Sequence, residues 1–567
     1  MKTALHGSAN TAPGAARYRL LLLSTAGFGG LLYGVDIGII AAALLYLGRT
    51  VQLSVTQTSL IVAAVLAGSM ISSPLGGLLA DWLGRKKTML LAALMFLMSI
   101  VLIVVSQKFA SLFAGRLLQG MSGGIIAVVV PLYLAECLDA KTRGRGTALF
   151  QFMLTVGIAV ASLVGWFYTR RAEIQIASAN GSQMLIHEAQ SHAWRSMFLS
   201  ILYPGIVFFV GILFLQESPR WLVRKGKAVA ALKSLLRSSP SAESAQDELA
   251  LIQTAGQQTK NDIDLGGSSS LWQRRYIVPF LLACIVLACN QATGINTILG
   301  FLVMILTHAG LTATHATQGD AAVKILNCVI TVVAIALVDK KGRKFLLKLG
   351  TAGIFISLLS ASFIFFRFES TRLDATKEII GAQVNEKLDY PLDKTISGKP
   401  VELTVLYSYG DGTHMTTASD STGPTFLHIA PSSSGQKLRI SKAFYCAEPS
   451  SWVGWAITAC LGIFIASFSI GPGVVVWLVL SELMPTRIRS RGMGIALLFN
   501  QGVSTVIAAS FLPVVGSLGY YAVFAIWTGC SLFYFLIATF FLPETKGRTL
   551  EEIEASFTEP GRRLEAL

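Results

Sequence analysis

The sequence predicts an all-α membrane protein with twelve membrane-spanning helices arranged as two six-helix pseudo-repeats. Of the 567 residues, 53% are hydrophobic and only 14% are charged, whereas soluble domains carry roughly 25% charged residues. The apolar residues gather in runs close to the ~20 residues that a helix needs to cross a bilayer. These runs are too long and too uniformly apolar for barrel strands, so they are predicted to be helices, which satisfy their own backbone in lipid.

Each predicted span begins and ends where the apolar run meets charged or turn-forming residues. In chain order the spans cover residues 20–47, 56–80, 88–106, 109–134, 147–168, 196–216, 276–306, 320–338, 345–366, 452–482, 492–516 and 519–542.

The basic residues set the predicted orientation. The net charge is +15, which on a soluble protein would favour nucleic acid. Here Lys and Arg concentrate in the short loops 81–87, 136–146, 339–344 and 485–491, and short basic loops face the cytoplasm. Both termini are therefore predicted to be cytoplasmic, no nucleic-acid partner is expected, and the basic loop 169–195 is a partial exception.

The same charged sequence motifs occur in the same order in both halves. Asp81 with Gly84 and Arg85 returns as Asp339 with Gly342 and Arg343, and each half repeats a Glu followed by arginines. Transporters are often built from such repeats, with the substrate between them. The predicted organisation is a cytoplasmic tail 1–19, an N-terminal bundle 20–216, a cytoplasmic helical linker 217–275, a C-terminal bundle in two parts, 276–366 and 452–542, an extracytoplasmic insertion 367–451 and a cytoplasmic tail 543–567.

The insertion explains why the second repeat is longer than the first. From Asp81 to Glu136 is 55 residues, but from Asp339 to Glu482 is 143. Within the insertion, 401–409 alternates like a strand and is followed by a Gly-Asp-Gly turn. A small β-containing domain is predicted there, with disorder as the alternative.

Charged residues inside the spans are the first candidates for function, because burying them in lipid costs ~2.5–3.5 kcal/mol even on lenient scales. Asp36 in the first span and Arg116 in the fourth lie at similar depth and can pair, and Lys324 lies near the outer end of the eighth span. Asp36 is taken as the only acid well inside a span. It is either half of a structural ion pair or an acid that takes a proton when Arg116 moves away.

Amides inside the spans are the second candidates, because an amide donates and accepts hydrogen bonds as sugar hydroxyls do. The alternative is that they hydrogen-bond one helix to another. Gln291 and Asn296 come together if the helix unwinds at Gly294, and an indole offers a flat face to a sugar ring. The candidate binding residues are Gln151, Asn290, Gln291, Asn296, Asn327, Trp477 and Asn500.

A third group of charged residues lies at the cytoplasmic ends of the spans. Acidic residues stand beside arginines in both halves, so these charges either anchor the orientation or form a gate network that closes this face. The predicted network consists of Asp81, Gly84, Arg85, Glu136, Arg143, Glu217, Arg220, Asp339, Gly342, Arg343, Glu482, Arg487, Arg491 and Glu544.

These motifs together resemble the sugar porter branch of the major facilitator superfamily over the whole spanning region. The matching segments, in family order, are Gly29–Asp36 (GGLLYGVD), Asp81–Lys87 (DWLGRKK), Pro131–Glu136 (PLYLAE) with Arg143 and Arg145, Glu217–Leu222 (ESPRWL), Asn290–Asn296 (NQATGIN), Asp339–Arg343 (DKKGR), Gly471–Trp477 (GPGVVVW), Ser481-Glu482 and Pro543–Gly547 (PETKG).

The resemblance implies alternating access of two bundles around a central sugar. It places the family's sugar-binding amides at Gln151, Gln291, Asn296 and Asn327 and its binding-site tryptophan at Trp477, and it makes Asp36 with Arg116 look like the coupling pair of bacterial proton symporters. The sequence departs from the family pattern at Tyr33, Asn290, Gly300-Phe301 and Gln501, and in the insertion.

The predicted function is therefore proton-coupled symport of a monosaccharide, a hexose or pentose, by a multi-pass protein of the inner or plasma membrane that works as a monomer. A facilitative uniporter and a non-transporting sugar sensor are the alternatives. The sequence offers no nucleophile–base–acid set, metal cluster or phosphate-cradling loop, so neither an enzyme nor a cofactor is expected. The predicted partners are the sugar, protons and the lipid bilayer.

Overall fold

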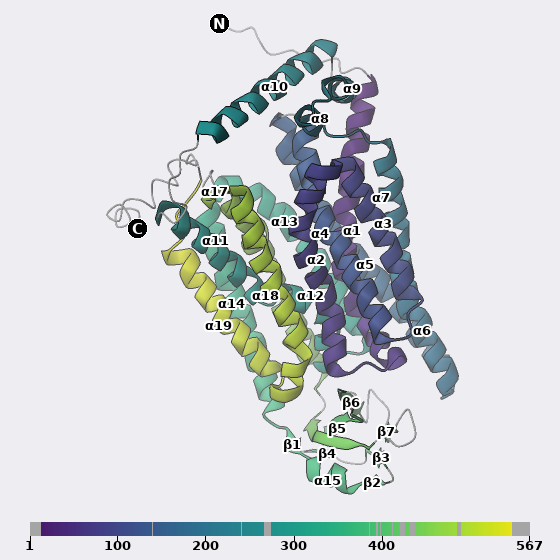
Figure 1. The fold of residues 1–567 in the computed structure, drawn as a ribbon. Helices are drawn as coiled ribbons and strands as arrows, with labels where there is room; N and C mark the ends of the chain where they lie inside the picture. Colours follow the sequence, from purple (N-terminus) through teal and green to yellow (C-terminus); the bar gives the residue numbers. More distant parts are fainter. Residues whose placement is uncertain are drawn as a thin grey trace.

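A computed structural model describes most of the chain, and this described part contains twelve helices, some of them broken, that are long and apolar enough to cross a membrane. The described residues are 13–138, 140–239, 241–265, 274–384, 386–392, 395–396, 399–410, 412–419, 426–430, 437–447, 449–484 and 489–546. The fold class predicted from the sequence is confirmed, as is a small β-containing insertion in the second half (Figure 1).

The N-terminal half contributes six spans. Its helices are α1 (Pro13–Val51), α2 (Val55–Leu83), α3 (Arg85–Val104), α4 (Phe109–Cys137), α5 (Ala140–Ser178), α6 (Gln183–Ser200) and α7 (Leu202–Phe214), with α6 and α7 forming one span. The C-terminal half repeats the arrangement. Its helices are α11 (Arg274–Ala292), α12 (Ile295–His308), α13 (Ala313–Lys341), α14 (Arg343–Glu369), α16 (Ser451–Ile470), α17 (Pro472–Leu483), α18 (Arg489–Leu518) and α19 (Tyr520–Phe540), with α11–α12 and α16–α17 each forming one span.

The segment 169–195 differs from the expectation that it is a loop. Helix α5 continues to Ser178 and α6 begins at Gln183, so the two spans extend as a helical hairpin. The apolar pattern stops at Arg170 because this hairpin carries polar residues, although these residues still favour helix. Arg195 has a local role that explains a basic residue here: its guanidinium donates to the Val104 and Ser106 carbonyls at the end of α3.

Three helices outside the spans, α8 (Pro219–Arg224), α9 (Ala228–Ser238) and α10 (Ala242–Leu265), connect the halves at one end of the bundle (Figure 1). We call this end the linker face and the opposite end, which carries the β-insertion, the insertion face. All three helices lie within 217–275, the segment for which the sequence analysis predicts a helical linker.

The two halves meet most extensively along three helix pairs, α1 with α12, α2 with α18 and α5 with α13. The contacts are close toward the insertion face. The Leu512 amide donates to Ser59 Oγ at 3.1 Å, and a Cβ atom on Gly300 would lie 2.9 Å from Val62 Cγ1. In Figure 1 the halves converge toward the insertion face and diverge toward the linker face.

The insertion folds around its own hydrophobic core, which includes Leu388, Val401, Leu403 and Leu427. One sheet has the strand order β1-β8-β5-β4, with β6 also paired to β5, and the other has the order β2-β3-β7. The elements are β1 (Leu373–Asp374), α15 (Thr376–Gly381), β2 (Gln383–Val384), β3 (Lys387–Pro391), β4 (Thr395–Ile396), β5 (Lys399–Ser408), β6 (Thr413–Ser419), β7 (Phe426–Ile429) and β8 (Arg439–Ala447).

The insertion touches both halves of the bundle, but lightly. Toward the N-terminal half, a Cβ atom on Gly412 would lie 3.0 Å from the Cβ of Ser54 at the start of α2. Toward the C-terminal half, Lys442 Nζ donates to the Ser517 carbonyl at 3.3 Å. The insertion is held more firmly where it leaves the bundle. There the Arg372 guanidinium lies 4.4 Å from the Phe444 ring of β8 and 2.6 Å from Glu369 Oε1 at the end of α14.

Candidate functional site

A cluster of amides lies where α11 gives way to α12. Asn296 Nδ2 donates to Gln291 Oε1 at 3.0 Å and to Ser504 Oγ of α18 at 2.9 Å, and Gln291 Nε2 donates to Asn500 Oδ1 at 3.2 Å. Gly294 separates the two helices with a left-handed φ of 82°, a conformation that side-chain-bearing residues rarely adopt. The expected unwinding at this glycine is confirmed, and it brings Gln291 and Asn296 into contact.

Two buried amide oxygens near this cluster lack a hydrogen-bond partner among the described residues, Asn290 Oδ1 and Gln501 Oε1. An acceptor buried without a donor costs free energy, so these atoms are suited to accept bonds from a polar substrate. Asn327 of α13 is 8% exposed, and its Oδ1 accepts from Ser469 Oγ at 2.5 Å. The C-terminal half therefore gathers most of the predicted binding residues.

The other two predicted binding residues stand apart from these hydrogen bonds. Gln151 lies half-buried on α5 of the N-terminal half. Trp477 lies on α17 and is 40% exposed. Their roles in sugar binding remain predictions.

Asp36 and Arg116 form a buried ion pair between α1 and α4. Arg116 Nη1 lies 3.1 Å from Asp36 Oδ1, and the two side chains are 1% and 0% exposed. The same nitrogen donates to Gln119 Oε1 at 2.7 Å, and the guanidinium lies 5.6 Å from the Phe198 ring. Asp36 Oδ2 has no hydrogen-bond partner among the described residues. The site thus holds a fully buried carboxylate that keeps one oxygen without a hydrogen-bond partner among the described residues.

A second buried acid corrects the expectation that Asp36 is alone inside the spans. Helix α13 begins at Ala313, earlier than predicted, so Asp320 lies inside the span and not at its edge. Asp320 lies 2.8 Å from Lys324 Nζ, and both side chains are at most 1% exposed. Lys324 lies eleven residues after the start of the 29-residue helix, and not near its outer end. The i,i+4 spacing of Asp and Lys was the signal that could have revealed the pair.

On the linker face, the N-terminal half carries a network centred on Arg85. Its guanidinium lies 2.9 Å from Asp81 and 2.8 Å from Glu136, although Arg85 itself is only 2% exposed. Glu217 accepts from the backbone amides of Arg85 and Lys86 at the start of α3. These contacts link α2, α3, α4 and the segment before α8.

Gly84 allows this arrangement, because its φ is +98° and a Cβ atom there would lie 2.3 Å from Glu217 Oε2. Arg220 was expected to belong to this network, but the described ion pairs do not include it. It is exposed on α8, and Arg224, one turn later, reaches Asp81 and Glu136 at 3.3 and 3.4 Å.

The C-terminal half repeats the network. Arg343 Nη2 lies 3.3 Å from Glu482, and Glu544 accepts from the amides of Arg343 and Lys344 at 3.1 Å each. Gly342 holds a φ of +88° beside Glu544, as Gly84 does beside Glu217. The side chains of Arg143, Asp339, Arg487 and Arg491 lie outside the described residues.

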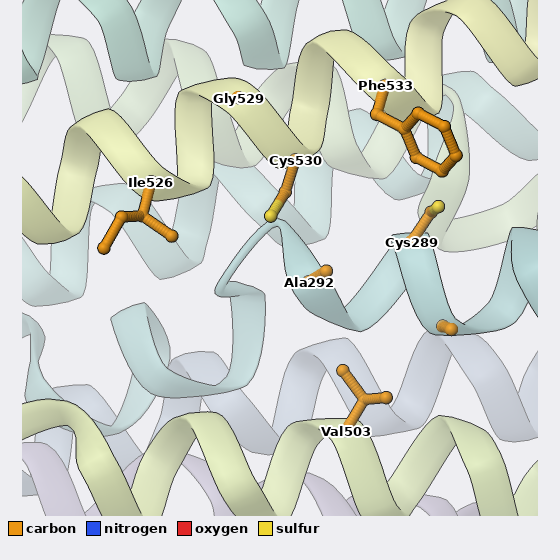
Figure 2. Close-up of a pocket in the computed structure, with 8 residues that line it drawn as sticks. Cys289, Ala292, Val503, Ile526, Gly529, Cys530 and Phe533 are labelled. Carbon is orange, nitrogen blue, oxygen red and sulfur yellow. The ribbon is translucent and has the colours of Figure 1, made fainter.

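An apolar groove with a volume of about 460 Å³ lies between α11, α18 and α19 (Figure 2). Ala288, Cys289, Val503 and Cys530 are among the residues that line it. Its lining side chains offer no amide, hydroxyl or charged group to a sugar, in contrast with the amide cluster. We therefore place the candidate substrate site at the amides and not in this groove.

The family model described as "Sugar (and other) transporter" matches residues 22–382 and 433–557. The chain belongs to this sugar transporter family. The family is one of transporters, not enzymes, and the part between the matched ranges lies within the β-insertion.

Relatives of this sugar transporter cover nearly its whole length. It is 28% identical over 556 residues to the glucose transporter GlcP of Staphylococcus epidermidis, covering 97% of this chain and 100% of that protein. It is also 28% identical over 556 residues to solute carrier family 2, facilitated glucose transporter member 12, of Xenopus laevis, covering 95% of this chain and 90% of that protein.

Among solved structures, the transporter is similar to the xylose transporter XylE of E. coli in a partially occluded inward-open conformation. The TM-score is 0.66 at 21% sequence identity, covering 94% of this chain and 100% of that chain. This likeness supports the fold, which is that of the major facilitator superfamily.

We expect Gln291→Ala to weaken sugar binding by this transporter about tenfold, because a lost hydrogen bond to a buried polar partner costs ~1–3 kcal/mol. Isothermal titration calorimetry of the purified protein measures the effect. Gln190→Ala on α6 is the control, because Gln190 has the same 7% exposure as Gln291 but lies outside the amide cluster. Equal affinities for the two variants would exclude Gln291 from the binding site.

Proposed function

We propose that this chain is a proton-coupled monosaccharide symporter that works by alternating access. The observation that carries the proposal is the buried Asp36–Arg116 pair, whose carboxylate keeps one oxygen without a partner. Protonation of Asp36 would release Arg116 toward Gln119, 2.7 Å away, and so couple a proton to a movement of α1 against α4. The amides around Gly294 would hold the sugar.

The arrangement of the halves supports an inward-facing state in this proposal. The contacts between halves lie toward the insertion face, and the halves diverge toward the linker face (Figure 1). We assign the linker face to the cytoplasm because basic loops concentrate there. The protein would then be a plasma- or inner-membrane carrier with both termini in the cytoplasm, functional as a monomer in which one chain forms the whole passage.

A facilitative uniporter is the second candidate, favoured by the relative named as a facilitated glucose transporter. Proteoliposomes separate the two mechanisms. A panel of labelled hexoses and pentoses is offered with and without an inward proton gradient, and internal sugar and external pH are followed. Accumulation above the external concentration together with alkalinisation outside supports symport. Equilibration without accumulation supports the uniporter, and no flux of any sugar contradicts both.

We also propose that the β-insertion is an addition to the transport core. Asp374 of β1 pairs with Phe444 of β8 in an antiparallel ladder, so a two-residue Asn-Gly turn in place of 375–443 would close a hairpin without moving α14 or α16. We expect this deletion variant to reach the membrane and to exchange labelled sugar in proteoliposomes as the full chain does. A folded variant with no exchange would instead assign the insertion to a gate on its face.

A further inference from the structure

The Asp320–Lys324 pair is a buried charged group that the proposed mechanism does not use. Asp320 and Lys324 are 1% and 0% exposed, with the ammonium 2.8 Å from one carboxylate oxygen and 2.9 Å from the other. Charged residues inside membrane spans are rare and functional by default. A pair needed only to stabilise α13 would be complete with these two contacts.

The ammonium makes a third contact that crosses between the halves. Lys324 Nζ donates to the Gly38 carbonyl oxygen of α1 at 3.1 Å. Gly38 lies where α1 approaches α5 so closely that a Cβ atom would be 2.8 Å from the Ile158 carbonyl, and α5 packs on α13. The bond therefore joins the C-terminal half to a tightly packed part of the N-terminal half.

This bond depends on the halves being together. If α1 and α13 separate toward the insertion face, the ammonium loses the Gly38 carbonyl while Asp320, on the same helix, moves with it. The ion pair is thus common to both arrangements, and the carbonyl contact belongs to the closed one. Gly38 follows Asp36 by two residues, so the contact is made by the helix that carries the proposed proton site.

We propose that Lys324, with its charge balanced by Asp320, is a positioning residue that latches the two halves together toward the insertion face by binding the Gly38 carbonyl. Opening toward that face requires this bond to break. The proposal rests on the proposed alternating access but not on proton coupling, and it assigns the closed state a contact that neither the sugar amides nor Asp36 supplies.

Two double variants separate a latch from a structural ion pair. Asp320→Asn with Lys324→Met removes both charges and leaves no unpaired carboxylate. Asp320→Lys with Lys324→Asp keeps an ion pair at the same spacing but moves the ammonium one turn away from Gly38. A structural pair would tolerate the exchange of the two residues, whereas a latch would be lost in both variants. Asp320→Asn with Lys324→Gln replaces the first variant if that one does not yield monodisperse protein.

The measurement is the rate at which a cysteine introduced by Val62→Cys is labelled. Val62 is 5% exposed and contacts Gly300 of the other half. A membrane-impermeant maleimide is applied from the insertion face of proteoliposomes, and the chain without the introduced cysteine gives the blank. We expect both double variants to label at least about fivefold faster than the Val62→Cys parent, the lower end of typical coupling between sites. If the exchanged-pair variant, alone or together with the neutral variant, is labelled at the rate of the Val62→Cys parent, the latch proposal is wrong.

The labelling needs neither sugar nor a proton gradient, so its outcome is independent of the uptake experiment. A parent that equilibrates sugar without proton coupling would contradict symport and leave the latch test intact. If the parent accumulates sugar and both double variants are labelled at the rate of the parent, the latch proposal is wrong and the symport proposal is still supported.

Discussion

Asp36→Asn is expected to abolish uphill sugar accumulation while sugar exchange down a gradient continues. The amide keeps the shape of the side chain but cannot carry the proton. Arg116 would retain Gln119 Oε1 at 2.7 Å as an acceptor and the Phe198 ring at 5.6 Å as a neighbour, so the variant should fold. Proteoliposomes loaded for counterflow measure exchange, and the same vesicles under an inward proton gradient measure accumulation.

The control for this variant is Glu173→Gln on α5. Glu173 accepts a hydrogen bond from the Tyr46 hydroxyl at 2.7 Å and lies outside the proposed coupling pair, so its neutralisation should leave accumulation unchanged. If the Asp36→Asn protein still accumulates sugar with normal dependence on the proton gradient, Asp36 is not the proton site. If it loses exchange as well, the pair serves structure or gating and not coupling.

Gly84→Ala is expected to lower stability by about 2 kcal/mol or more and to remove most sugar exchange. The residue holds φ at +98° between α2 and α3, a conformation that costs other residues ~1–3 kcal/mol. The new methyl group would also lie 2.3 Å from Glu217 Oε2 and would push the carboxylate off the amides of Arg85 and Lys86. Losing those bonds leaves partly buried donors without their acceptor, at a cost of up to ~1–3 kcal/mol each.

The matched control is Gly77→Ala, earlier on the same helix. No heavy atom lies within 4 Å of a Cβ atom placed there, and Ala is favoured over Gly in a helix by roughly 0.5–1 kcal/mol. Thermal unfolding in detergent and counterflow exchange should therefore separate the two variants. Similar unfolding temperatures for Gly84→Ala and Gly77→Ala would show that the carboxylate contact with α3 contributes little.

Much of the architecture follows from local rules that the sequence displays directly. Apolar runs define the spans because lipid leaves the backbone no other partner. The contact of Gln291 with Asn296 could be anticipated because only a residue like Gly294 takes a left-handed turn inside a span at low cost. The pairing of Asp36 with Arg116 could be predicted because opposite charges at similar depth in the membrane lower their cost of burial by forming an ion pair.

Other features depend on packing that hydropathy does not report. Asp320 marked the predicted edge of a span because a charged residue normally ends an apolar run, yet Lys324 neutralises it inside the helix. The extension of α5 beyond Tyr168 carries polar side chains that an apolar criterion excludes. Arg224 replaces Arg220 in the linker-face network because the direction in which α8 presents its side chains is set by tertiary contacts.

The paired ends of the β-insertion also bear on how the chain folds. A flexible connection between Glu369 and Ser451 would have to be closed before α14 and α16 could pack, and the closure entropy grows with the logarithm of its length. Once β1 and β8 pair through Leu373 and Tyr445, the insertion behaves as a connection of only a few residues. By the loop-closure relation this shortening is worth on the order of 2 kcal/mol. A domain that assembles early would thus promote assembly of the C-terminal half, acting as a folding aid built into the chain.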